Sequence, residues 1–133
     1  MRRSELREQV FKLLFRVEFN EIEEMPEQVR LFFEEENAAQ GDDAAYVESK
    51  YRDIVAHLAE IDEKLSAQAE GWNLARMGKV DLTILRLAIY EILFEEGVPT
   101  AVSINEAVEL AKKYGQDQSS GFVNGILAKF AHE

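Results

Sequence analysis

Apolar residues recur at helical spacing along the whole chain, and only two prolines interrupt the pattern. The first stretch carries apolar residues that share one helix face: Leu6, Val10, Leu13, Leu14 and Val17. Ser4 is a plausible N-cap, which predicts a first helix from there to about Phe19. This patterning indicates an all-α fold.

A second apolar stripe lies on the same predicted helix, where Phe11, Phe15 and Phe19 follow each other at intervals of four residues. It lies well round the helix from the first stripe, so only one of the two can face the same core. Two interpretations remain open. Either the three rings are buried against a second helical layer, or they form a surface for a partner protein.

The middle of the chain predicts further helices. Pro26 suits the first turn of a second helix. Residues 37–43 form a predicted loop that contains Gly41. The apolar positions from Val47 to Leu65 then fit either one long helix or two short helices with a break near residues 59–62.

Residues 80–94 are apolar almost all the way round, which is typical of a central, buried helix. Ser103 and Glu106 form a predicted capping box for the next helix, which should end at Gly115. Ser119 or Ser120 is then expected to cap a last helix. The pattern therefore predicts about six or seven helices.

Composition favours a globular protein, with 47% apolar and 31% charged residues and no cysteine. No apolar run is long enough for a membrane span, and the N-terminus lacks the apolar segment of a signal peptide. We therefore expect a cytoplasmic protein that is not associated with a membrane.

The net charge of −11 is unevenly distributed. Residues 18–48 contain eleven acidic residues and one base, Arg30, whereas residues 1–17 contain five bases and two acids. The acidic segment reads most simply as a solvated face. A local basic patch elsewhere remains compatible with the low pI of the whole chain.

The sequence offers no convincing catalytic or metal site. His57 and His132 are not in a metal-ligand spacing, and no glycine-rich phosphate loop is present. Carboxylate pairs are common in so acidic a chain, so none of them indicates catalysis. We expect neither enzymatic activity nor a cofactor.

Residues suited to binding occur in two places. Arg2, Arg3 and Arg7 lie at or before the start of the first helix, where guanidinium groups can grip phosphates or remain solvated. The loop 116–121 leads into Phe122, which can stack on a base if exposed or belong to the core.

Two charged residues belong to the predicted central helix. Asp81 near its start is either a first-turn acid or a contact for a partner. Arg86 is predicted to form an internal ion pair, with a carboxylate such as Glu91, rather than to reach a ligand.

The C-terminal half closely resembles the NusB family of bacterial transcription antitermination factors. The resemblance rests on the strings Asn105-Glu106-Ala107-Val108-Glu109-Leu110-Ala111-Lys112 and Phe122-Val123-Asn124-Gly125-Ile126-Leu127, preceded by Trp72, Arg76, Asp81, Ile84-Leu85-Arg86, Tyr90-Glu91 and Pro99. The first helix matches less sharply, through Arg7, Glu8, Leu14 and Phe15.

This resemblance implies two packed helical subdomains, at about residues 1–70 and 71–133. It implies a non-catalytic adaptor that pairs with the ribosomal protein NusE, binds single-stranded boxA RNA and joins elongating RNA polymerase. The RNA-binding residues would be Arg2, Arg3, Arg7, Gln118, Ser119, Ser120 and Phe122. The partner-binding residues would be Phe11, Phe15, Phe19 and Asp81.

Three departures from the family pattern predict weak RNA binding by the protein alone. Only Arg2 and Arg3 precede the first helix, Phe15 replaces an aromatic residue that often carries a hydroxyl, and residues 18–48 are unusually acidic. Two alternatives stay open: a helical adaptor that binds only proteins, and a relative of the domain fused to RNA cytosine methyltransferases. The phenylalanine stripe also permits a homodimer.

Overall fold

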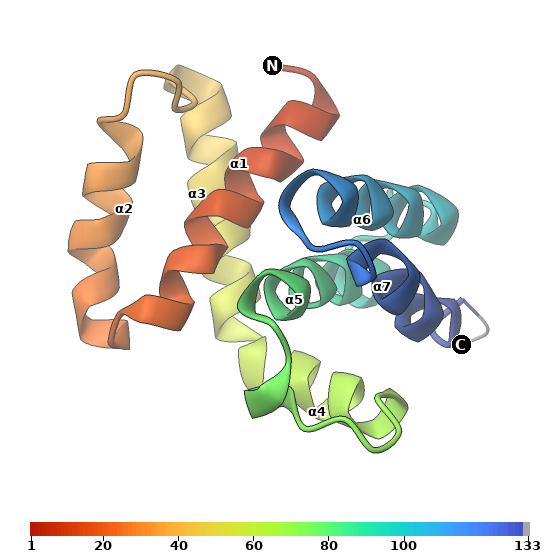
Figure 1. Cartoon of the computed structure of the whole chain (residues 1–133). Coiled ribbons are helices and arrows are strands. Elements are labelled where there is room, and N and C mark those ends of the chain that lie inside the picture. The colour runs from red at the N-terminus through yellow and green to blue at the C-terminus, as the bar shows by residue number, and fades with distance from the viewer. Residues whose placement is uncertain (132–133) are drawn as a thin grey trace. The chain divides into compact units, whose positions relative to one another are not determined.

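The computed structural model describes residues 1–131, and within that range every regular element is a helix (Figure 1). The prediction for His132 lies outside the described residues. The elements are α1 (Arg3–Phe15), η1 (Arg16–Phe19), η2 (Ile22–Glu24), α2 (Met25–Phe33), α3 (Gly41–Ala56), α4 (Leu58–Gln68), η3 (Leu74–Arg76), α5 (Lys79–Phe94), α6 (Thr100–Tyr114) and α7 (Ser119–Ala128), where η marks a short 3₁₀ helix. The all-α prediction is confirmed.

The chain divides into two compact units, which we call the first unit (residues 1–55) and the second unit (residue 56 onward). The sequence analysis placed the subdomain boundary near residue 70. The division falls earlier because α4 packs on α5 and so belongs with the C-terminal helices.

In the first unit, one side-chain amide holds the long connection between α2 and α3. The Gln9 side chain of α1 donates to the Asn37 carbonyl (3.3 Å) and accepts from the Ala39 N–H (2.9 Å). Gln9 is itself buried, and these bonds replace the water that its amide loses. The core of this unit includes Val10, Leu13, Leu14, Met25, Val29, Phe32, Val47, Tyr51 and Ile54.

The segment between residues 44 and 70 forms two helices, α3 and α4, which answers the question that periodicity left open. The break lies at His57, slightly before the predicted window at residues 59–62. The His57 ring lies 4.3 Å from the ring of Phe94 on α5. Ile61 and Leu65 of α4 are completely buried in the second unit.

Helix α5 is the central element of the second unit, as its apolar pattern predicted, and α4, α6 and α7 all pack against it. One carboxylate is buried there. Glu91 is only 1% exposed and accepts a 2.8 Å hydrogen bond from the hydroxyl of Ser103 on α6, which is equally buried. The hydroxyl compensates part of the solvation that the carboxylate loses.

Three predicted helix ends were wrong. Helix α1 is preceded by Arg2 rather than capped by Ser4, and it changes to 3₁₀ geometry after Phe15. Ser103 is not a cap, because α6 already begins at Thr100 and places Ser103 inside the helix, facing Glu91. Helix α7 begins at Ser119, with Gln118 as its N-cap residue.

Arg86 forms the expected internal ion pair, and Asp62 of α4 is a carboxylate with which it pairs. The guanidinium makes two hydrogen bonds to Asp62, each 2.9 Å long. This paired geometry ties α4 to α5 within the second unit.

Candidate RNA and partner interface

The five bases of residues 1–17 have different roles in the first unit. Arg2 and Arg3 are exposed, whereas Arg7 is only 8% exposed. Arg16 donates to the Gln28 carbonyl (3.2 Å) and pairs with Glu35 (2.6 Å), so it connects η1 to α2. Lys12 is also exposed and lies 3.9 Å from the Glu8 carboxylate, so the exposed positive charge near the chain start comes from Arg2, Arg3 and Lys12.

Solvent exposure increases along the phenylalanine stripe from Phe11 to Phe19. Phe11 is 3% exposed, Phe15 is half-buried and Phe19 is 60% exposed. The rings contact in sequence, with centroids 6.1 Å apart for Phe11 and Phe15, and 5.0 Å apart for Phe15 and Phe19. Neither open interpretation holds for all three rings, because one end of the stripe is core and the other is surface.

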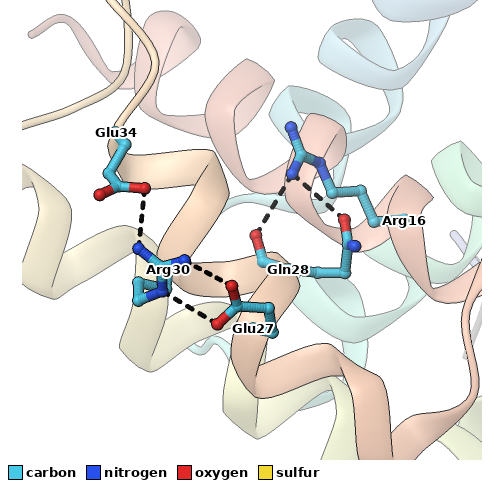
Figure 2. Close-up of polar contacts among 5 residues, drawn as sticks. All are labelled: Arg16, Glu27, Gln28, Arg30 and Glu34. Atoms are coloured by element: carbon cyan, nitrogen blue, oxygen red, sulfur yellow. Dashed lines mark hydrogen bonds and ion pairs between the residues drawn. The ribbon is translucent and has the colours of Figure 1, made fainter.

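Helix α2 carries an exposed acidic face with one central cation (Figure 2). Arg30 makes hydrogen bonds to Glu27 and to Glu34, the latter 3.0 Å long. The bonds from Arg30 lower the pKa of the Glu27 carboxyl below its ordinary value, and the two carboxylates raise the pKa of Arg30. Because these side chains are exposed, we expect their ion pairs to contribute little to the stability of the fold.

In the second unit, a tight turn places four of the predicted RNA-binding residues together at the start of α7. The Ser119 hydroxyl accepts a 2.9 Å hydrogen bond from the Gln116 N–H, and Ser119 is buried. Gln118 is exposed, while Ser120 and Phe122 are half-buried. Ser119 therefore shapes the turn, and Gln118, Ser120 and Phe122 are the members that reach solvent.

Gly115 makes this turn possible through close packing. A Cβ atom at Gly115 would lie 2.5 Å from the Ser119 Cβ and 2.7 Å from the Ala111 carbonyl oxygen. The residue ends α6, as predicted, but its φ of −92° is accessible to any amino acid. Space rather than backbone freedom requires glycine here.

Phe122 has a neighbour that the sequence analysis did not place in the site. The Trp72 ring lies 5.0 Å from the Phe122 ring in an edge-to-face arrangement, and Trp72 is 57% exposed. The only sequence signal was a tryptophan within a connection flanked by Gly71 and Gly78. Periodicity does not report on such residues, because the connection between α4 and α5 lacks a helical repeat.

Asp81 lies in the first turn of α5 and is half-buried. The negative charge near a helix N-terminus suits the helix dipole, so this position also has a structural explanation. Within residues 1–131, no group of three or more His, Asp or Glu side chains is arranged to hold a metal ion. No helix in the described part of the chain has the length and apolarity needed to cross a bilayer.

Comparison with known proteins gives a consistent result. The model of the NusB family matches residues 4–132. The transcription antitermination protein NusB of Agathobacter rectalis is 53% identical over 131 residues, which cover 98% of this chain and all of that protein. The protein of the same name from Pseudothermotoga lettingae is 46% identical over 132 residues, covering 98% of this chain and 91% of its own.

Solved structures are similar over the same length. NusB of T. maritima superposes with a TM-score of 0.87 at 38% identity, covering all of this chain and 92% of its own. A structure described as antitermination factors NusB and NusE in complex with dsRNA superposes with a TM-score of 0.84 at 27% identity, covering 98% of this chain and 96% of the matched chain.

Proposed function

Because this chain belongs to the NusB family, we propose that it works in transcription antitermination as a non-catalytic adaptor. In this role it binds boxA-type RNA together with NusE and joins the elongating RNA polymerase. The observation that carries the proposal is the likeness over nearly the whole chain to a NusB that was solved together with NusE and RNA. Transcription takes place in the cytoplasm of bacteria, and we assign the protein to that compartment.

On the RNA side, we assign phosphate contacts to Arg2 and Arg3 and base contacts to the start of α7. The exposure of both arginines and of Gln118, together with the half-exposed Phe122 ring, supports this assignment. Arg7 and Ser119 are buried, so we assign them a structural role in α1 and α7 rather than a direct RNA contact. Single-stranded RNA suits the site, because unstacked bases offer their faces to an aromatic ring.

On the partner side, we assign NusE binding to the exposed end of the phenylalanine stripe and to Asp81. Phe19 and the half-buried Phe15 have exposed surface that a partner can cover. Phe11 is buried and supports Phe15 from the core. A homodimer through the same rings would compete with NusE. Sedimentation of the protein with and without NusE distinguishes the two assemblies.

The first test is a titration of labelled boxA-type RNA with the protein alone and with NusE present, at several salt concentrations. We expect weak binding alone and tighter, sequence-dependent binding with NusE. Charge reversal of both arginines (Arg2→Glu and Arg3→Glu) should weaken binding and make the salt slope shallower by about 1.4, for two phosphate contacts on a single strand.

The matched control for this test reverses two exposed bases elsewhere, Arg52→Glu and Lys64→Glu. Both double variants change the net charge by the same amount. An equal loss of RNA affinity in the two would therefore mean that only the total charge of the protein matters. An absence of RNA binding by the unmodified protein with NusE would overturn the proposed function.

The partner surface has its own prediction. Phe15→Asp should weaken NusE binding by about 30-fold, because a carboxylate would be desolvated where an aromatic anchor is expected. Phe15→Tyr keeps the ring and should leave affinity within about threefold of the unmodified protein. Isothermal titration calorimetry measures both, with Leu31→Asp as an exposed apolar control on α2. Undiminished binding by Phe15→Asp would remove Phe15 from the interface.

A further inference from the structure

Trp72 is the only tryptophan in the chain, and the fold leaves this residue 57% exposed. An indole ring is costly to leave in water, since it forms one of the largest apolar surfaces of any side chain. Its contact with Phe122 is edge-to-face, with the ring planes at 69°. In such a pair the edge of one ring contacts the face of the other, and the exposed part of the indole remains available to a ligand.

The backbone fixes Trp72 in this exposed position. Gly71 has a φ of +80°, a conformation that other residues rarely adopt, and it turns the chain after α4. The Trp72 N–H then donates to the Ala69 carbonyl (2.8 Å). The next residue, Asn73, accepts from the Ala75 N–H (2.9 Å) and so caps η3. The ring therefore sits on an ordered connection between two turns.

A second contact aligns this connection with α7. Lys129 donates to the Gln68 carbonyl (2.9 Å) and lies 3.6 Å from the Glu70 carboxylate. Phe122 and Lys129 are seven residues apart and hence on one side of α7. The residues from Gln68 to Trp72 therefore follow that side of the helix, and Trp72 meets its first turn. All of these contacts lie within the second unit.

The surroundings of the two rings favour a nucleic acid base as the occupant. Phe122 belongs to the start of α7, which is proposed above as the base-binding side, so the indole extends an aromatic surface that already has a predicted ligand. Arg76, four residues after Trp72 at the end of η3, is exposed, and its guanidinium is a candidate contact for a phosphate. In sites for single-stranded nucleic acids, successive bases stack on aromatic side chains of the protein.

We propose that Trp72 is a second base-stacking residue, and that Trp72 and Phe122 together take two neighbouring bases of single-stranded RNA. The inference rests on the proposed function and deepens it, because it assigns a residue and a number of bases to the RNA side. Because the two rings are already held in place before RNA binds, less conformational entropy is lost on binding.

The single tryptophan permits a direct test, since all indole fluorescence reports on Trp72. We titrate the full chain with single-stranded boxA-type RNA, with and without NusE, and follow tryptophan emission together with the anisotropy of labelled RNA. Emission should be quenched in parallel with binding, and the duplex of the same sequence should quench less. Quenching by NusE alone, with none added by RNA, would show that a protein covers Trp72 and would overturn the inference.

Variants separate stacking from folding. Trp72→Ala should weaken RNA binding by about tenfold, within the range seen for base-stacking rings, whereas Trp72→Phe keeps a π-face and should recover most of the affinity. Tyr46→Ala, which removes another exposed aromatic residue, is the matched control. Circular dichroism verifies that each variant is folded.

The outcomes distinguish this inference from the proposed function. If the unmodified protein binds RNA and Trp72→Ala binds equally well, the stacking role of Trp72 is wrong and the adaptor function stands. If the unmodified protein does not bind RNA even with NusE, the adaptor function fails and the stacking inference fails with it.

Discussion

Glu91→Ala is expected to lower the free energy of unfolding by about 3 kcal/mol. The substitution removes a fully buried side chain from the centre of the second unit and leaves the Ser103 hydroxyl without its 2.8 Å acceptor. Both the cavity and the unsatisfied hydroxyl contribute to the loss. Urea unfolding followed by circular dichroism measures it, as a lower midpoint with an unchanged slope.

Three companion variants define the origin of the loss. Glu91→Gln keeps the shape and an acceptor oxygen, so it should cost less than Glu91→Ala. Glu96→Ala removes an exposed glutamate a few residues away and should change stability by less than about 0.5 kcal/mol. A double-mutant cycle with Ser103→Ala gives the coupling between the two groups. Equal stability of Glu91→Ala and the unmodified protein would show that this buried pair is dispensable.

Gly115→Ala is expected to destabilise the protein by about 2 kcal/mol and to weaken RNA binding as well. The new methyl group would overlap Ser119 and the Ala111 carbonyl oxygen, so the start of α7 must move. That movement would break the bond from the Gln116 N–H to the Ser119 hydroxyl and displace Phe122. Thermal unfolding and the RNA titration described above measure the two effects.

Gly125→Ala on α7 is the matched control, because a Cβ atom there meets nothing within 4 Å. Alanine favours a helix over glycine, so this variant should gain up to about 1 kcal/mol. If Gly115→Ala were as stable as Gly125→Ala, the close approach at the α6–α7 turn would be more tolerant than its geometry indicates.

Helical periodicity predicted the elements well but not their ends. Residues 80–94 read as a buried helix because nearly every position is apolar, and α5 is that helix. Ser103 shows the limit of such reasoning. Its local sequence fits a capping box, but the buried carboxylate of Glu91 on another helix uses its hydroxyl. Tertiary contacts of this kind have no local signature.

The candidate site was predicted in part for the same reason. Arg86 was expected to pair internally, yet Asp62 lies 24 residues away on α4, and nothing in the sequence connects the two. Phe122 was a candidate from its position after the loop 116–121 and also from the family resemblance, and its RNA-binding role stays a prediction. Trp72 was not among the predicted site residues, since only the folded chain brings its ring against Phe122 of α7.

The carboxylates around α2 should help the first unit to discriminate among nucleic acids, because they repel polyanions. Many of them are exposed, and Arg30 is the only base among residues 18–48. Repulsion acts over roughly 8 Å at physiological salt, so any polyanion close to this face is disfavoured. Bulk DNA and transfer RNA should therefore compete poorly. Selectivity for the correct RNA would then come from repulsion of other nucleic acids as well as from attraction of that RNA.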